Sequence, residues 1–558
     1  LTFAADYRAV GLAPFRYHVI SLLVHLAAGV LAFLLSRRLL ARAGHPRAAA
    51  LALLAAGAFL LHPIQTQAVA YAAQRSEVLA SAFYLLVLLL LEEAAARWRT
   101  PRGGAAWAGG VGAWLLAMGS KSIPITAPAA FVLDQAVVAP EGERGAAALW
   151  SRTRRALLVA APAFSLAAWS AWLHLRAFSA TPQTGVGFQS LALPVGHYLL
   201  TQLRVQWLYL RLLAWPDALA LDRTFDPSRG LDAASALAGL GVLALLGLAT
   251  WLWVRAERGR GDVPLQRIAA FGIYWWFLLL APSSSVIPVV DLAVEHRVYL
   301  ASLGPILAAI AGADAALARL PPRRAGAAGA ALGAAVLLAL GAALRARAGV
   351  WATEESLWRD ASAKSPGSAR ILTNLGLALQ RKGDLDGAEA AYRRAWPMAR
   401  EPLQVRQLAR NYGGLLEMRH RPAEALPILE LGLSVDSEDP ELRANRAVAL
   451  AQLGRREEAI AEARRAAAAA PGDPAIRNLL GEVLAYHQQW AAALEEFRVA
   501  AAIDPGSPTY LANQVVPLAG VGQRDEACAL LRQVTSRFPA AQLPREVPRW
   551  RSMIGCPP

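Results

Sequence analysis

Four cationic side chains could bind an anion because they lie at the ends of long apolar segments: Arg75, Lys121, His296 and Arg297. Charge at membrane depth is costly, and such residues usually face a polar cavity or a partner. A guanidinium binds phosphate through a planar pair of donors, and an ammonium binds it as a point charge. The pattern therefore predicts a cavity that holds an anionic group. The alternative is that these cations pair with nearby carboxylates, such as Glu77, and tie the ends of helices together.

The same segments carry further polar side chains that we expect to line this cavity: His18, His62, Gln65, Glu295 and Tyr299. His18 and His25 are seven residues apart and share one face of a helix. Two histidines can ligate a metal, but no carboxylate lies close to them in the sequence. We therefore expect substrate or packing contacts there and no metal site. The sequence identifies no cofactor.

Helices that cross a membrane must position these residues. Of the 558 residues, 56% are hydrophobic and 17% are charged, whereas soluble proteins average about 25% charged residues. A helix needs about 20 apolar residues to cross the hydrocarbon core. The sequence predicts ten spans near residues 19–36, 48–61, 77–91, 105–119, 122–139, 156–175, 234–254, 268–282, 298–318 and 325–344. Their many small residues predict a closely packed bundle.

The net charge of +15 comes largely from arginines in the loops between these spans. Arginine-rich loops stay in the cytoplasm, which explains the charge better than nucleic-acid binding does. We assign to the cytoplasm the loops 37–47, 97–104, 140–155, 255–267 and 319–324. The loops 62–76, 177–195 and 283–297, the short turn at Ser120 and Lys121, and everything after 345 are then external. The segment 196–215 would reverse this alternation if it crossed fully, so we predict that it is re-entrant or interfacial.

A repeat of 34 residues organises the end of the chain. Alanines recur at this spacing at Ala425, Ala459, Ala493 and Ala527, and prolines at Pro471, Pro505 and Pro539. This period, with small residues at the helix contact and Pro at the end of each unit, is typical of tetratricopeptide repeats (TPRs). The array predicts a helical solenoid whose groove takes a protein or peptide.

The predicted fold is thus all-α: a multi-span membrane domain over 1–345, a linker or first helix over 346–370, and about five TPRs over 371–558. The two cysteines, Cys528 and Cys556, form no metal or disulfide framework. They could form one disulfide if this end of the chain lies in an oxidising compartment.

Four motifs, in order along the chain, resemble one family. They are Asp6-Tyr7 to His25, Leu61-His62-Pro63-Ile64-Gln65 to Leu79, Lys121 with Pro124 and Asp134, and Glu295-His296-Arg297-Val298-Tyr299-Leu300. Together they resemble bacterial relatives of the transmembrane-and-TPR O-mannosyltransferases, which belong to the GT-C glycosyltransferases. The sequence departs from the family pattern at Gln67, where glutamate is frequent.

The resemblance implies transfer of a sugar from a polyprenyl-phosphate carrier to a protein or other acceptor at the external face. It implies that Arg75, Lys121, His296 and Arg297 bind the donor phosphate. Inversion at the sugar carbon needs a carboxylate that deprotonates the acceptor hydroxyl. Asp6 is the one carboxylate in the first external segment and our catalytic candidate. The chain begins at Leu1, so we expect the usual catalytic acid of this class upstream of it.

Two other functions fit the same sequence. A non-catalytic membrane scaffold could present the TPR groove to partners in envelope or export assembly. A weaker alternative is a transporter of lipid carriers or polysaccharide. An acidic pair just upstream of Leu1 would favour the enzyme.

We predict a multi-pass protein of the inner membrane with its TPRs in the periplasm, because one span separates the last arginine cluster (319–324) from Trp351. A phosphatase reporter that folds only outside the cytoplasm, fused after Pro558, should be active. A reporter that is active only in the cytoplasm would overturn this topology.

Overall fold

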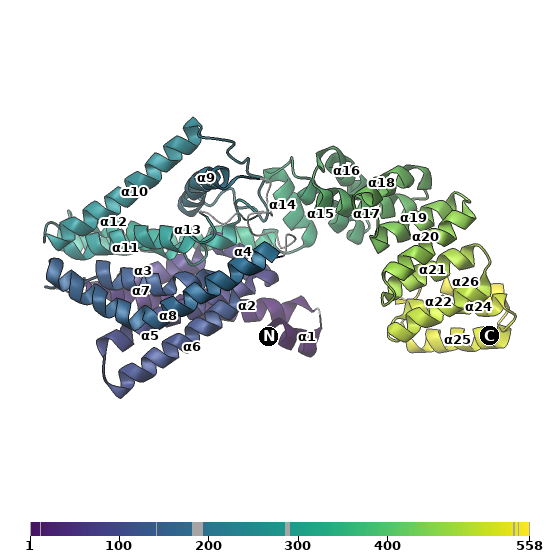
Figure 1. Ribbon diagram of the computed structural model, residues 1–558, viewed down its shortest axis with the longest axis horizontal. Helices are drawn as coiled ribbons and strands as arrows, with labels where there is room; N and C mark the ends of the chain where they lie inside the picture. The colour runs from purple at the N-terminus through teal and green to yellow at the C-terminus, as the bar shows by residue number, and fades with distance from the viewer. Residues whose placement is uncertain are drawn as a thin grey trace. The chain divides into compact units, whose positions relative to one another are not determined.

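The computed structural model describes residues 2–11, 13–140, 142–180, 193–284, 289, 291–539, 542–544 and 546–556. The regular secondary structure of these residues is helical, with no β-strand, which confirms the predicted all-α class (Figure 1). The chain divides into two compact units, Leu1–Lys364 and Ser365–Pro558. The short helix α14 (Glu354–Lys364), which we assigned to a linker, belongs to the first unit.

Each of the ten segments predicted as spans overlaps with one α-helix of the first unit. In chain order these helices are α2 (Pro14–Arg42), α3 (Ala48–Leu61), α5 (Arg75–Ala96), α6 (Pro101–Ser120), α7 (Ala127–Val137), α8 (Ala146–Ala180), α10 (Ala233–Glu257), α11 (Val263–Leu280), α12 (Leu303–Leu317) and α13 (Pro322–Val350). The predicted loop 177–195 begins later than expected, because α8 extends to Ala180. Residues 181–192 lie outside the described residues.

Five helical segments in the described part of the chain are long and apolar enough to cross a membrane: Pro14–Arg42, Ala72–Ala96, Ala233–Glu257, Val263–Leu280 and Pro322–Val350. A sixth results if α3 and Pro63–Ala70, which are bent by 49° at their junction, form one span. Ile123–Val137 and α12 are apolar but shorter than the ~20 residues that a crossing needs. These helices indicate association with a membrane.

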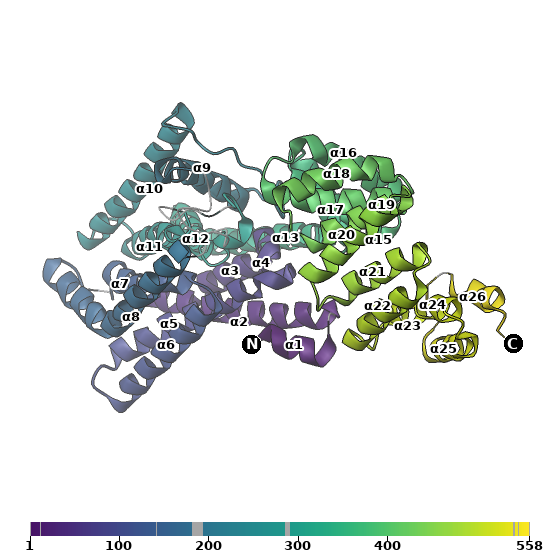
Figure 2. The same cartoon turned by 45° about the vertical axis from the view of Figure 1, so that its right-hand side comes forward.

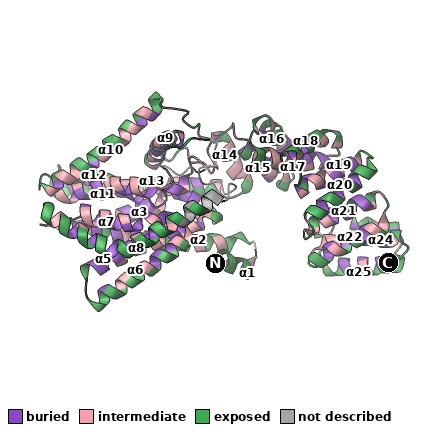
Figure 3. Ribbon diagram, in the orientation of Figure 1, coloured by how far each residue is buried: buried purple, intermediate pink, exposed green. Residues whose placement is uncertain are grey.

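Glycines allow the closest approach between helices in this unit. A Cβ atom at Gly272 of α11 would lie 2.3 Å from the carbonyl oxygen of Gly304 of α12, and the reverse distance is the same. In lipid, helices associate through such tight packing of small residues. In contrast, only 11% of the most apolar window of α10 is buried (Figure 3). The side chains of α10 therefore face the surrounding medium, as those of a lipid-facing helix do.

Ion pairs between helices hold one end of the first unit together. Arg42 at the end of α2 pairs with Glu92 of α5 (2.9 Å) and with Asp134 of α7. Arg47, just before α3, pairs with Asp314 of α12 (2.6 Å). The arginine-bearing ends of several helices thus meet, and we call this the arginine-rich end. Its carboxylates offset part of the positive charge.

The helix α9 (Val195–Ala214) lies across the opposite end, which we call the site end. In Figure 1 it is seen nearly end-on, whereas α11 and α12 run across the view. The hydroxyl of Tyr209 donates to the carbonyl of Val294 (2.9 Å), and the carbonyl of Leu213 accepts from Nε2 of His62 (2.8 Å). These contacts join α9 to residues 62 and 294, and Trp207 donates to the carbonyl of Ala238 near the start of α10 (3.0 Å).

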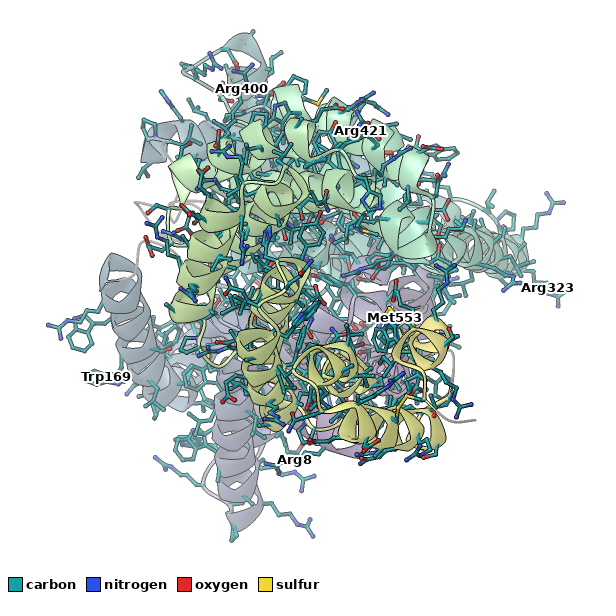
Figure 4. The ribbon with its side chains drawn as sticks, turned by 90° about the vertical axis from the view of Figure 1, so that its right-hand side faces the viewer. Arg8, Trp169, Arg323, Arg400, Arg421 and Met553 are labelled. Atoms are coloured by element: carbon teal, nitrogen blue, oxygen red, sulfur yellow. A yellow bond between two sulfur atoms is a disulfide. The ribbon has the colours of Figure 1, made fainter. Side chains whose placement is uncertain are left out.

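The second unit consists of helix pairs: α15 (Ala369–Lys382) with α16 (Leu385–Ala395), α17 (Pro402–Met418) with α18 (Pro422–Val435), α19 (Pro440–Gln452) with α20 (Arg456–Ala469), α21 (Pro474–Tyr486) with α22 (Trp490–Ile503), and α23 (Pro508–Ala512) and α24 (Val515–Gly520) with α25 (Arg524–Arg537). Partners in a pair lie side by side (Figure 2). A last helix, α26 (Val547–Ile554), is tied to α25 by the disulfide Cys528–Cys556 (Figure 4). TPR-like repeats thus form this unit, as predicted.

Candidate functional site

The site end is built from short turns between the apolar helices. His62 begins the turn η1 (Pro63–Gln65), where its Nδ1 accepts the N–H of Ile64 (3.1 Å). The helix α4 (Thr66–Ala70) follows and leads towards α5, which begins at Arg75. A second turn, η5 (Glu295–Val298), precedes α12 and contacts both η1 and α4. Side chains from distant parts of the sequence therefore meet here.

Gln67 anchors η5 to α4. Its Oε1 accepts the N–H of His296 (2.7 Å), and its Nε2 donates to the carbonyl of Leu221 (2.5 Å). An amide can accept and donate at once, whereas an ionised carboxylate can only accept. This explains how glutamine serves at a position where the family pattern often has glutamate. We did not expect Gln67 in the site, and its place in the His62-Pro63 motif is the one sequence feature that pointed to it.

Lys121, which follows α6, reaches the start of α5. Its Nζ lies 2.6 Å from Oε2 of Glu77 and 3.0 Å from Oε1 of Gln74. Glu77 is buried, and its other carboxylate oxygen has no hydrogen-bond partner among the described residues. The Lys121 side chain is 30% exposed. Its ammonium can therefore contact a ligand while it holds Glu77.

Arg297 of η5 lies close enough to Glu77 for their charges to interact. Its guanidinium donates to the main-chain carbonyls of Asp291 (2.5 Å) and Leu292 (3.4 Å), and no carboxylate forms an ion pair with it among the described residues. Tyr198 of α9 lies beside it, a neighbour that we did not predict because α9 is distant in sequence. An arginine held by carbonyl oxygens keeps its affinity for an anion.

Glu295 is a carboxyl group with a pKa near neutrality. Burial raises its pKa to about 7, although a hydrogen bond from the N–H of Ala220 (2.6 Å) and the charges of Arg347 and Arg223 lower it. Its Oε2 is buried and has no partner among the described residues. Glu295 therefore gains or loses a proton close to pH 7.

His296 is a neutral imidazole at that pH. Burial lowers its pKa, and the positive charges of Lys121 and Arg297 lower it further. Its Nδ1 is buried without a partner in the described part of the chain. Lys121, His296 and Arg297, three of the four predicted phosphate ligands, are thus neighbours, and the imidazole adds a neutral hydrogen-bonding group beside two cations.

The fourth predicted ligand, Arg75, pairs with the predicted catalytic residue, Asp6. Nη1 of Arg75 lies 2.5 Å from Oδ2 of Asp6, Nη2 donates to the carbonyl of Tyr17 (2.9 Å) and Nε donates to Oγ of Ser21 (3.3 Å). The Arg75 side chain is fully buried. Its hydrogen bond lowers the pKa of Asp6, and a second bond from Arg16 (3.1 Å) adds to this effect. The predicted phosphate ligand Arg75 and the predicted catalytic residue Asp6 thus form an ion pair with each other.

The remaining residues that we expected to line the cavity differ in their burial. His18 is exposed, whereas Gln65 is buried and donates through Nε2 to Oγ of Ser302 (3.1 Å). The buried hydroxyl of Tyr299 lies 2.7 Å from Nδ1 of His25. Among the described residues, no group of three His, Cys, Asp or Glu side chains could hold a metal ion.

Known proteins resemble this chain mainly in its second unit. Models of the tetratricopeptide repeat match residues 355–400 and 417–483. Protein O-mannosyl-transferase Tmtc1 of Drosophila melanogaster is 38% identical over 91 residues, which are 16% of this chain and 10% of that protein. The second unit therefore carries TPRs, and a small part of the chain is similar to an O-mannosyltransferase.

Solved structures with a similar chain trace also match less than half of this chain. PilW, a type IV pilus biogenesis factor, is 20% identical, with 35% of this chain and 87% of that chain covered and a TM-score of 0.31. YrrB, a TPR protein, is 21% identical, with 32% and 91% covered and a TM-score of 0.25. At such scores these likenesses carry no argument about function.

We expect Asp6→Asn to destabilise the protein clearly more than a matched control does, because it leaves the buried guanidinium of Arg75 without this counter-charge. Asp217→Asn is the matched control, since Asp217 forms a half-exposed pair with Arg211 (2.8 Å). That substitution should cost less than about 1 kcal/mol. Denaturant unfolding in detergent measures both. A stable Asp6→Asn protein that has lost sugar transfer would instead support a catalytic role for Asp6.

Proposed function

We propose that this protein is a membrane glycosyltransferase that moves a sugar from a polyprenyl-phosphate carrier to a protein or other acceptor at the external face. The observation that carries the proposal is the convergence of Lys121, His296 and Arg297 at the site end, with Arg297 unpaired by any described carboxylate. The similarity of part of the chain to an O-mannosyltransferase supports it.

The proposed reaction needs fixed positive charge. The bond between the anomeric carbon of the sugar and the phosphate oxygen of the carrier breaks, and that oxygen keeps the electron pair. The acceptor oxygen bonds to the carbon and gives up its proton. Arg297 and Lys121 would stabilise the charge that develops on the phosphate, which is most effective where water is scarce.

The proton of the acceptor hydroxyl needs a carboxylate. We proposed Asp6 for this role, but its ion pairs with Arg75 and Arg16 lower its pKa and make it a weak base. The Asp6→Asn experiment described above decides between a role in the reaction and a role in holding Arg75.

Two features support a periplasmic site with the TPRs on the same side. The chain leaves α13 beside the site end, where the ring of Trp351 lies 6.4 Å from that of Tyr71. The disulfide between Cys528 and Cys556 is of a kind that persists in oxidising compartments such as the bacterial periplasm. If the arginine-rich end lies in the cytoplasm, the site end and the segment that follows α13 lie on the periplasmic side of the inner membrane. The disulfide would then be in an oxidising compartment.

We expect Arg297→Lys to leave the protein folded and to reduce sugar transfer by about 10²–10³-fold, because lysine keeps the charge but loses the paired donors. Thermal unfolding and transfer from a polyprenyl-phosphate donor are measured in parallel. Arg204→Lys is the control, since Arg204 also donates to a main-chain carbonyl, that of Asp226 (3.2 Å), but carries no proposed role.

The two measurements separate the possible roles of Arg297. A loss of stability with a proportionate loss of transfer would assign Arg297 to holding the loop before η5. Unchanged transfer and unchanged stability would exclude both roles and, with them, this mode of phosphate binding.

A non-catalytic scaffold is the second candidate, and free polar groups on α17 favour it. Nδ2 of Asn411 and Oε1 of Glu417 are buried without partners among the described residues. The corresponding amide of the next repeat, on Asn445, is instead used up by the carbonyl of Arg410 (3.1 Å). Such unpaired donors and acceptors can bind the main chain of a peptide once the side chains that cover them move aside.

The probe is a peptide selected from a random library for binding to the wild-type protein. We expect Asn411→Ala to leave the stability unchanged and to weaken binding of this peptide by about fivefold, which is the effect of one lost hydrogen bond. Gln533→Ala removes an exposed amide from α25, the second helix of its pair, and should have no effect. Equal affinities for all three proteins would exclude the use of Asn411 as a peptide contact.

A further inference from the structure

A large apolar cavity in the first unit borders the site end at His62, and its lining includes none of Lys121, His296 and Arg297. It has a volume of about 860 Å³ and runs between α3, α12 and α13, with the end of α9 at its border. Its walls are almost wholly apolar, with Leu54, Ala58, Ile306, Ala309 and Val336 among them. Binding cavities for small molecules have volumes of about 300–1,000 Å³, so this one can hold a substantial ligand.

The medium around this cavity is hydrocarbon if the first unit spans a membrane. The helix α13 is one of the five candidate spans, and only 6% of its most apolar window is buried. Several of its large apolar side chains are exposed, including Leu332, Val336 and Leu338. The lining residues of α3 extend from Arg47 to His62, which is about 22 Å at the usual rise per residue. The cavity therefore follows much of the ~30 Å hydrocarbon core.

The two ends of the cavity differ in charge. Arg47 and Asp314 border it at the arginine-rich end, where Asp314 is already bound by Arg47 (2.6 Å) and by His45 (3.1 Å). Three exposed arginines without a described ion-pair partner lie just beyond: Arg319, Arg323 and Arg324. Arg323 projects outward from the end of its helix (Figure 4).

At the site end the cavity is bordered by His62 and has no lysine or arginine in its lining. Both ring nitrogens of His62 are already hydrogen-bonded, one to the carbonyl of Leu213 (2.8 Å) and one to the N–H of Ile64 (3.1 Å). Within the lining of this cavity, an anionic headgroup would therefore find a cation only at the arginine-rich end.

We propose that this cavity holds an acyl chain of an anionic phospholipid whose headgroup lies against Arg319, Arg323 and Arg324. Basic groups next to a gap between membrane helices are a recognised arrangement for anionic lipid headgroups. The site is distinct from the proposed donor site and does not depend on the transferase activity. A polyprenyl carrier with its phosphate at the site end is the competing occupant, which the absence of a lysine or arginine from the lining at that end disfavours.

The full-length protein is purified in nanodiscs of equal parts phosphatidylglycerol and phosphatidylcholine, and the lipids that stay bound after mild detergent extraction are identified by native mass spectrometry. Arg323→Gln with Arg324→Gln tests the headgroup contacts. Ala330→Trp tests the cavity, because Ala330 lines it and is exposed, so the larger side chain fills the gap without entering the core. Arg258→Gln with Arg260→Gln is the control, since both arginines are exposed in the loop between α10 and α11.

The wild-type protein and the control should retain phosphatidylglycerol in preference to phosphatidylcholine. The Arg323/Arg324 variant should lose about 30-fold in this preference, as expected for two arginines near a lipid surface. Ala330→Trp should retain neither lipid. An equal loss in the control, or retention of phosphatidylglycerol by Ala330→Trp, would overturn the proposal. So would added polyprenyl phosphate that displaces the lipid regardless of Arg323 and Arg324.

Discussion

Unpaired charge at the border of an apolar medium is expensive, and this cost shapes both ends of the first unit. At the arginine-rich end, Arg42 joins α2 to α5 and α7 through Glu92 and Asp134. At the site end, Arg75 joins the start of α5 to the N-terminal segment through Asp6. Each pair neutralises charge and at the same time fixes one helix against another. Arg297 departs from this pattern, since it is held by carbonyl oxygens without a described carboxylate partner.

Much of the architecture could be predicted from the sequence because its signals are periodic or local. Apolar segments marked the helices of the first unit, and the 34-residue spacing of Ala425, Ala459, Ala493 and Ala527 marked the repeats. Among the described residues, five or six of the ten predicted spans coincide with helices long and apolar enough to cross a membrane. The apolar segment of α12, in contrast, forms a helix of only 15 residues.

The pairing of the site residues could not be predicted, because it depends on contacts between residues far apart in the sequence. Arg75, Lys121, His296 and Arg297 look equivalent as cations at the ends of apolar segments. The structure separates them: Arg75 is neutralised by Asp6, whereas Lys121 and Arg297 lie near the single carboxylate of Glu77. The contacts of Gln67 with His296 and of Tyr198 with Arg297 depend on the position of η5 in the fold, which the spacing of residues in the sequence does not predict.

The disulfide between Cys528 and Cys556 affects how the repeat array comes apart. In a solenoid each repeat is stabilised by its neighbours, so a terminal repeat has support on one side only and frays first. Here a covalent bond joins residues 28 apart and keeps α26 on α25 when their non-covalent contacts open. Local unfolding of this repeat would then leave a covalently closed loop. In a reducing environment this restraint would be lost, and α26 could separate from α25.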